Sequence, residues 1–282
     1  MKVQKYGEYN PELKETFNPV EFTERAVLFP LDHLLGMLLQ HNPEIHQQFI
    51  TELISKIQPM IETNYVKIKS IDIQKTLRKL ENLKNYPELA EVMVNLSLKL
   101  YNLPENIAWE NAEIDILERN ISRGSYFPNY YQVLVLSKIT EKKEAFDLYK
   151  NHYKLYREKR HRIQKYEDLE AVREFFIAGA EEWGTVHIIS EVTAGKLIVR
   201  RDYCTISEVL KELDDPELAH LIACSGDFGY WKASNPNFVL TRKYTLMEGH
   251  PYCDFVFHDT RINEDLNHPS KEFFDKLWPK DQ

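Results

Sequence analysis

Apolar residues between about residues 20 and 183 recur every three to four positions, the period of a helix that is buried on one face. We therefore predict a run of helices in this part of the chain. We expect helix breaks at Pro59 and Pro128, because proline disfavours helical backbone in the residue before it. Two apolar stripes are Ile45, Phe49, Leu53 and Ile57, and Leu89, Val92, Leu96 and Leu100. Thr140 is the expected N-cap of a further helix that carries Ala145, Leu148, Tyr149, His152 and Tyr156.

The apolar period changes from helical to alternating after Gly184, which indicates β-strands. Residues 186–189 and 197–199 are apolar runs on either side of Thr193-Ala194-Gly195, a turn signal. This arrangement predicts a β-hairpin whose second strand continues toward Cys204.

A second alternating pair consists of residues 237–247 and 252–258, joined by a turn at Glu248-Gly249-His250-Pro251. Between the two pairs, the capping-box sequence Thr205-Ile206-Ser207-Glu208 and the Asp215-Pro216 pair each predict the start of a helix. The order is therefore ββ-αα-ββ. We predict an α+β fold class, with a helical N-terminal region followed by this antiparallel unit.

These patterns divide the chain into three regions. Residues 1–160 form a predicted helical region, and residues 161–260 form the predicted α+β region. Residues 261–282 form a polar tail in which Ser270 caps a final short helix.

The charge balance narrows the classes of partner. Lys and Arg number 36 against 44 Asp and Glu, and the net charge of −8 provides no general attraction to nucleic acid or to anionic lipid. We interpret the basic run at residues 157–162 as a solvated helix face. No apolar run is long enough to span a bilayer, and the N-terminus lacks the apolar core of a signal peptide.

The number and spacing of the cysteines indicate the cellular compartment. Three cysteines without a CxxC pair indicate a reducing environment rather than a disulfide scaffold, so we expect a cytoplasmic protein. We expect no nucleic-acid or membrane partner, and we leave a homo-oligomer open. The sequence contains no P-loop, Rossmann glycine fingerprint, GxSxG elbow or HExxH motif, so the corresponding enzyme classes have no support.

Arg242 lies in the middle of the predicted strand 237–247. A buried guanidinium without an anion is costly, so it needs a partner. That partner is an internal Asp or Glu side chain, or the carboxylate of a ligand; alternatively, the strand is an edge that is open to water. The neighbours of Arg242 on the same face are apolar: Phe238, Leu240, Tyr244 and Leu246.

Asp227 lies on a predicted turn bounded by Gly226 and Gly229. Its carboxylate caps this turn, or the side chains of Tyr230 and Trp231 desolvate it and raise its pKa, as a general base requires. The residues alone favour neither alternative.

The three cysteines fall near the ends of predicted elements. Cys204 precedes a helix, where the dipole favours a thiolate, and Cys224 ends a helix, where the dipole disfavours one. Cys253 begins a strand. Three interpretations remain open for these cysteines. They are small buried apolar residues, they are reactive thiols, or they bind zinc together with His187, His250 or Asp227. Their spacing matches no zinc finger or ribbon, so we predict no metal site and assign no cofactor.

The α+β region contains a series of unusual residues whose order and spacing match those of a known family. The series comprises Tyr203-Cys204, Cys224-Ser225-Gly226-Asp227-Phe228, Asn235-Pro236, Arg242, Thr245-Leu246-Met247-Glu248-Gly249 and Cys253-Asp254-Phe255-Val256-Phe257. It resembles the L-2-amino-thiazoline-4-carboxylic acid hydrolase family. The resemblance covers about residues 165–260 and implies that residues 161–260 are a catalytic region.

The resemblance implies a hydrolase that opens a small carboxylate-bearing cyclic amidine or isothiourea, such as 2-aminothiazoline-4-carboxylate, by hydrolysis of a C–N bond. Arg242 would anchor the carboxylate, and Asp227 would act as a base or as the partner of the amidine. Cys224 or Cys253 would act as a nucleophile or an acid. The predicted site residues are Asp227, Cys224 and Cys253 for catalysis and Arg242, Tyr230 and Trp231 for substrate binding.

A similar cysteine-bearing α+β architecture occurs in small-ligand-binding domains of the 4-vinyl-reductase type. The alternative function is therefore non-enzymatic binding or sensing of a small ligand at the same site. In both cases the expected partner is a small molecule.

Overall fold

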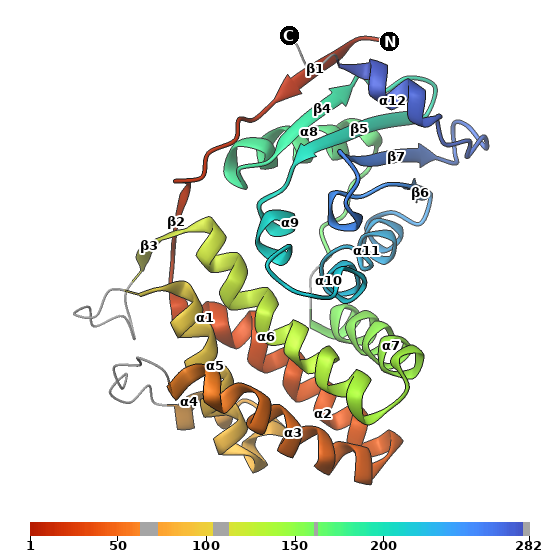
Figure 1. The fold of residues 1–282 in the computed structure, drawn as a ribbon. Helices are drawn as coiled ribbons and strands as arrows, with labels where there is room; N and C mark the ends of the chain where they lie inside the picture. The colour runs from red at the N-terminus through yellow and green to blue at the C-terminus, as the bar shows by residue number, and fades with distance from the viewer. Residues whose placement is uncertain (63–72, 104–112, 161–162, 279–282) are drawn as a thin grey trace. The chain divides into compact units, whose positions relative to one another are not determined.

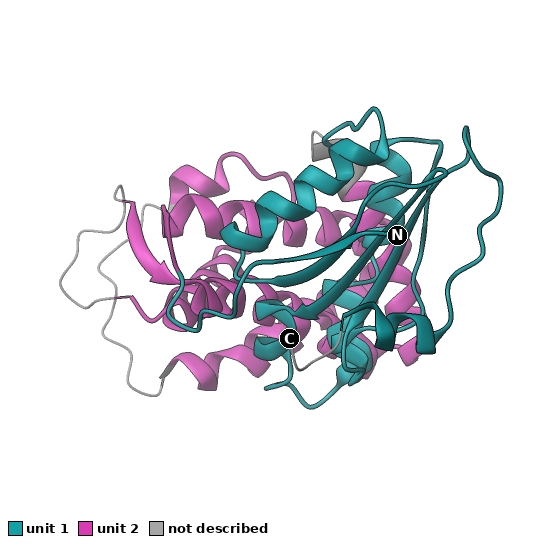
Figure 2. Ribbon diagram, turned by 90° about the horizontal axis from the view of Figure 1, so that it is seen from above, with its two compact units in different colours: residues 1–13, 161–282 teal, residues 14–160 magenta. Residues whose placement is uncertain are grey.

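The structure is a computed structural model that describes residues 1–62, 73–103, 113–160 and 163–278. The chain forms two compact units, which Figure 2 distinguishes by colour. Unit 2 comprises residues 14–160, and unit 1 comprises residues 1–13 together with residues 161–282. The first thirteen residues therefore pack with the C-terminal part of the chain rather than with the helices that follow them.

Unit 2 is mainly helical, as its apolar period predicts (Figure 1). It also contains a small antiparallel sheet of β2 (Lys14–Phe17) and β3 (Ile114–Leu117). Its helices are α1 (Pro19–Thr23), the π-helix η1 (Glu24–Leu28), α2 (Phe29–His41), α3 (Pro43–Glu62), α4 (Ile73–Leu77), the 3-10 helix η2 (Leu83–Asn85), α5 (Pro87–Tyr101), α6 (Glu118–Ile139) and α7 (Lys142–Arg160). The side chains of the basic run at 157–162 lie outside the described part.

The two helix breaks predicted at prolines are wrong. Pro59 lies inside α3 and Pro128 lies inside α6. A proline removes one backbone hydrogen bond of the helix, and packing on both sides of it can hold the helix together. Beside Pro128, the side-chain amide of Asn129 donates to the carbonyl of Ser125 at 2.7 Å, which adds a local bond.

Unit 1 contains a five-stranded antiparallel sheet in the order β1-β4-β5-β7-β6 (Figure 1). Its strands are β1 (Val3–Tyr6), β4 (Val186–Ser190), β5 (Lys196–Tyr203), β6 (Phe238–Thr241) and β7 (Cys253–Asp259). The predicted hairpin is confirmed as β4 and β5, and its turn contains Ala194 and Gly195, both with positive φ. The N-terminal strand β1 was not predicted.

The helices of unit 1 lie before, between and after these strands. They are α8 (Leu169–Glu182), α9 (Thr205–Leu210), α10 (Pro216–Ala223), α11 (Asp227–Ser234), the 3-10 helix η4 (Leu246–Glu248) and α12 (Lys271–Leu277). The α+β class is confirmed, but three helices rather than two separate the strand pairs, because α11 replaces the predicted turn around Asp227. Helix α9 has Cys204 at its N-cap position, not Thr205.

The two faces of the sheet carry different layers. On one face, Phe176 of α8 and Trp231 of α11 pack against Phe255 and Phe257 of β7 in the core of unit 1. The alternation predicted for β7 is therefore confirmed, since the residues between these two face the other side.

The C-terminal tail covers the opposite face. Phe274 of α12 is fully buried and stacks on Tyr252, with 5.9 Å between ring centroids. His268 Nε2 lies 2.8 Å from a carboxylate oxygen of Asp254. Ser270 accepts a bond from the backbone N–H of Phe273, so the predicted cap of the last helix is confirmed.

Strand β6 ends at Thr241, so Arg242 lies just beyond a strand and not in the middle of one. The cause is the buried carboxylate of Asp254, one oxygen of which accepts the backbone N–H groups of Lys243 at 2.9 Å and Tyr244 at 2.7 Å. These two N–H groups therefore do not donate to the backbone of β7, although the carbonyl of Tyr244 still accepts the N–H of Asp254 at 3.3 Å. The regular strand pairing ends here.

The hairpin turn provides a test of the fold. Gly195 has φ +73°, and an added Cβ would lie 2.9 Å from Cβ of Ile262. We expect Gly195→Ala to lower the free energy of unfolding by about 1–2 kcal/mol or more, because an L-residue is strained in this conformation. Urea denaturation followed by circular dichroism would measure the change.

Gly229→Ala is the matched control. Gly229 lies in helix α11, and an added Cβ would meet nothing within 4 Å. We expect this variant to be as stable as the wild type or about 0.5–1 kcal/mol more stable, because alanine favours helix. Equal losses in both variants would contradict the assigned turn and helix.

Candidate functional site

A row of three side chains crosses the sheet near the end of β5. His187 of β4 pairs with Arg201 of β5, and Arg201 pairs with Cys253 of β7. Between Val186 and His187 the register with β5 shifts by one residue, so that Asp202 is the extra residue of a β-bulge. The row lies on the sheet face that includes Phe255 of β7 and packs against Phe176 of α8.

Arg201 donates to a neutral imidazole. Its Nε donates to Nε2 of His187 at 2.8 Å, and Nδ1 of His187 lies 3.0 Å from the carbonyl oxygen of Phe176. Burial, with a further contribution from Arg201, lowers the pKa of His187 to about 3, so this imidazole is neutral at physiological pH. His187 then carries its proton on Nδ1 and donates it to Phe176, which leaves Nε2 to accept from Arg201.

The sulfur of Cys204 and two aromatic rings complete the surroundings of Arg201. Nη1 of Arg201 lies 3.9 Å from Sγ of Cys204. The guanidinium carbon lies 5.9 Å from the ring centroid of Phe176 and 5.3 Å from that of Phe255. Sequence reasoning missed Arg201, because its polar neighbours Arg200 and Asp202 make the end of this strand read as solvent-exposed.

Arg242 and Asp227, which the sequence places fifteen residues apart, form an ion pair at 2.5 Å. The side chain of Arg242 is only 2% exposed, whereas that of Asp227 is 35% exposed. Arg242 also donates to the carbonyl of Cys224 at 3.0 Å and lies 5.2 Å from the ring centroid of Phe255. Of the three alternatives for Arg242, the structure shows the internal carboxylate.

The cysteines are three free thiols that lie within electrostatic range of one another. Burial raises the pKa of Cys253 to about 12, and burial together with Asp227 raises the pKa of Cys224 well above its ordinary value. The backbone N–H of Leu246 donates to Sγ of Cys253 at 3.2 Å. Both thiols are therefore protonated at neutral pH.

Tyr230 and Trp231, which follow Asp227 in α11, lie in different surroundings. Trp231 is 4% exposed and packs in the core against Phe176 and Phe257. Tyr230 is partly buried at the edge of this core, with its ring against that of Trp231. Of the two predicted ligand-binding aromatics, Tyr230 is the one with exposed surface.

Among the described residues, no group of three or more His, Cys, Asp and Glu side chains is arranged to hold a metal ion. His250, considered above as a zinc ligand, packs its ring on Tyr244, with 4.6 Å between centroids.

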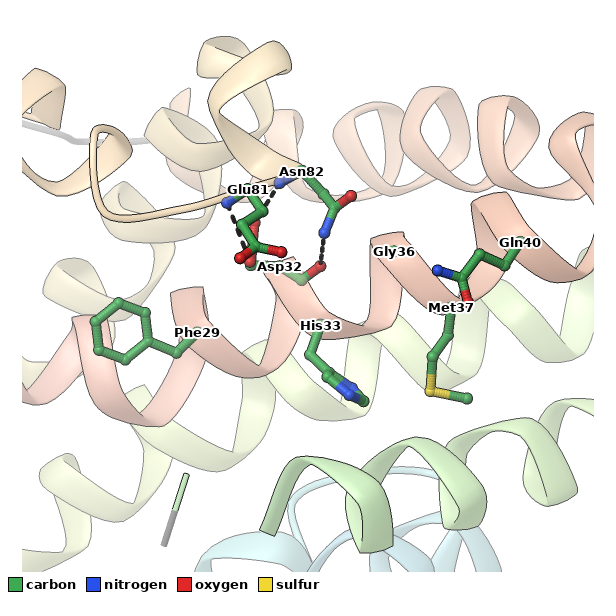
Figure 3. A pocket seen from close by; sticks show the side chains of 8 residues that line it. All are labelled: Phe29, Asp32, His33, Gly36, Met37, Gln40, Glu81 and Asn82. Atoms are coloured by element: carbon green, nitrogen blue, oxygen red, sulfur yellow. Dashed lines mark hydrogen bonds between the residues drawn. The ribbon is translucent and has the colours of Figure 1, made fainter. Parts of the chain in front are cut away.

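A separate hollow of about 230 Å³ lies in unit 2 and contains none of the predicted site residues (Figure 3). One wall is formed by Asp32, whose carboxylate accepts the backbone N–H of Asn82 and of Leu83, both at 2.8 Å. This carboxylate is therefore occupied in joining α2 to the start of η2. The residues that line the hollow are Phe29, Asp32, His33, Gly36, Met37, Gln40, Glu81 and Asn82.

No helix in the described ranges combines the length and the apolar character needed to cross a membrane.

The protonated thiols provide a test of the site. In the folded protein at pH about 8, we expect iodoacetamide to label Cys224 and Cys253 much more slowly than in urea, because the thiolate is the reactive form. Raising the pH from the ordinary thiol value of 9.0 toward 12 ionises the unfolded chain before Cys253, so stability should fall over this range. Peptide mass spectrometry and urea titrations measure the two effects, and equal labelling in both states would contradict this site geometry.

Comparison with curated proteins and with solved structures gave no match. A family model does match, over residues 125–257. The matched residues run from α6 into β7 and contain His187, Arg201, Asp227, Arg242 and the three cysteines. The model is that of L-2-amino-thiazoline-4-carboxylic acid hydrolase, and the resemblance of this chain to that family is thereby confirmed.

Proposed function

We propose that the chain is a hydrolase that opens a small carboxylate-bearing cyclic amidine or isothiourea by hydrolysis of a ring C–N bond. The family match supports a hydrolase. The observation that carries the proposal is the meeting of three thiols, the carboxylate of Asp227 and two guanidiniums, from four separate segments, on one end of the sheet.

Asp227 is the group that we propose faces the reacting carbon. Its Oδ2 is held by Arg242, and its side chain is the more exposed of the two. A carboxylate fixed in this way can accept two N–H groups from an amidinium or one O–H from the attacking water. Arg242 then acts as a positioning residue, since its own charge is taken up by Asp227.

The reaction is balanced by one water. Water adds to the ring carbon between sulfur and nitrogen, Asp227 accepts its proton, and the tetrahedral carbon then expels the ring nitrogen as an amine. A protonated thiol is the appropriate donor to that nitrogen, and Cys224 and Cys253 are both protonated. Asp227 then returns its proton to the resulting thiolate, so the enzyme is restored. The product contains the atoms of the substrate plus one water, with sulfur carrying the carbamoyl group.

Tyr230 is the proposed aromatic contact for the substrate ring, because it keeps exposed surface beside Asp227 in α11. We propose that Trp231 supports this contact from the core.

The second candidate function is binding or sensing of the same kind of ligand without turnover. It is favoured by one observation, the high pKa of Cys224 and Cys253, because a nucleophilic cysteine usually has a lowered pKa. This alternative predicts saturable binding of the small acid with no product.

Incubation with 2-aminothiazoline-4-carboxylate tests the proposal. We expect a product heavier by one water, detected by mass spectrometry. Asp227→Asn should lower kcat at least about 100-fold, because a general base and amidine partner is lost. Cys253→Ser should lower kcat to a smaller extent, because a hydroxyl is a poorer proton donor than a thiol.

Lys243→Gln is the control, because Lys243 is exposed and its side chain is not part of the site. Circular dichroism would establish that each variant is folded. Wild-type turnover in both Asp227→Asn and Cys253→Ser would refute the assigned site, and binding without product would favour the sensor.

A further inference from the structure

Two adjacent arginines of β5 are neutralised to different degrees. Arg200 contacts a carboxylate through two nitrogens, since Nε and Nη2 each lie 2.7 Å from an oxygen of Asp202. It also donates to the carbonyl oxygens of Phe274 and Trp278, at 2.7 and 3.1 Å. Arg200 is thus fully paired within the fold.

Arg201 lies on the opposite face and has no such partner. Its hydrogen bonds go to the neutral imidazole of His187 and to the sulfur of Cys204. Among the described residues, no carboxylate lies within ion-pair distance of it. The guanidinium is partly buried, and its contacts are an imidazole, a cysteine sulfur and two aromatic rings. No described carboxylate in direct contact compensates for its desolvation.

The charges of the site lead to the same conclusion. Arg201 and Arg242 contribute two positive charges, and Asp227 contributes one negative charge that Arg242 already contacts. His187 is neutral, and Cys224 and Cys253 are protonated. These groups, counted without Cys204, leave one positive charge uncompensated, and Arg201 is the arginine that no carboxylate in the described ranges contacts. A complementary anion would bind strongly in such surroundings.

We infer that Arg201, and not Arg242, binds the carboxylate of the substrate. This inference rests on the proposed function and specifies how the substrate is oriented. Nη2 of Arg201 makes no hydrogen bond with the described residues, and with Nη1 it can form the two parallel bonds that a carboxylate accepts. His187 acts as a positioning residue that fixes the plane of the guanidinium.

The positions of Arg201 and Asp227 would orient the substrate, because each would bind one of its charged groups. Arg201 and Arg242 both lie against the ring of Phe255, at 5.3 and 5.2 Å. A carboxylate on Arg201 and an amidine on Asp227 would therefore flank one aromatic side chain. The thiol of Cys253, the cross-strand partner of Arg201, lies in this same row.

A thiolate at Cys204 is the competing partner for Arg201, because its sulfur is already 3.9 Å away. The two possibilities predict opposite results. If Cys204 supplies the anion, Cys204→Ser should create carboxylate binding that the wild type lacks. If the substrate carboxylate is the anion, the wild type binds it, and Cys204→Ser still binds it.

Isothermal titration with two probes tests the inference. The probes are 2-aminothiazoline-4-carboxylate and the corresponding 4-carboxamide, which differ in the charge of one group. We expect wild-type protein to bind the carboxylate at least about tenfold more tightly than the carboxamide, because a charged hydrogen-bonded pair is lost in the latter. We expect Arg201→Gln to bind the two probes equally, and Arg201→Lys to keep part of the difference.

Lys243→Gln, which removes an exposed positive charge, is the matched control and should keep the full preference. The inference is overturned if Arg201→Gln keeps the preference, if Cys204→Ser alone binds the carboxylate, or if the wild type binds both probes equally or neither. If Arg201→Gln does not fold, the Arg201→Lys and Cys204→Ser variants and the wild-type comparison still decide.

Ring opening measured on the same samples separates this inference from the proposed function. Turnover with unchanged KM in Arg201→Gln would refute the anchor and leave the hydrolase in place. Carboxylate-specific binding through Arg201 without product would refute the hydrolase and leave the anchor.

Discussion

The ion pair between Arg242 and Asp227 is the interaction on which the end of the sheet depends. It joins the residue after β6 to the first residue of α11, and the second bond of Arg242, to the carbonyl of Cys224, extends the link to the end of α10. Removing Asp227 would leave a 2% exposed guanidinium without its anion, which is far more costly than losing a surface pair. The same bond also fixes the position of the Asp227 carboxylate.

The buried carboxylate of Asp254 has a comparable role on the opposite face. It ends β6 by accepting the N–H groups of Lys243 and Tyr244, and it contacts His268 of the C-terminal tail. Arg242 leaves the sheet at this point and can reach α11. Two aspartates on opposite faces therefore set the path of one short segment, and hydrogen bonding rather than apolar burial determines where the strand stops.

The sequence predicts the α+β class and the β4–β5 hairpin, because a hairpin depends on a local turn signal such as Ala194-Gly195. It places the first strand of the second pair but makes it too long, since β6 ends at Thr241. Strand β1 is only four residues long, and its partner β4 lies far away in the sequence, so no local pattern reveals it. Sequence reasoning selected Arg242 because apolar neighbours surround it. It could not show that Asp227 would reach that arginine, since such a contact depends on tertiary packing.

The alternation of side chains along β5 places Arg200 and Arg201 on opposite faces of the sheet, so only Arg200 contacts a carboxylate of the described residues. Asp202 lies on the same face as Arg200, so its carboxylate forms an ion pair with Arg200 and does not reach Arg201. Exchanging residues 202 and 203 would carry the acid to the other side of the sheet without altering composition or overall charge. The exchange would thus place a carboxylate beside Arg201 instead of Arg200, although the amino-acid composition stays the same. Two chains with the same residues in a different order therefore need not share the same chemistry.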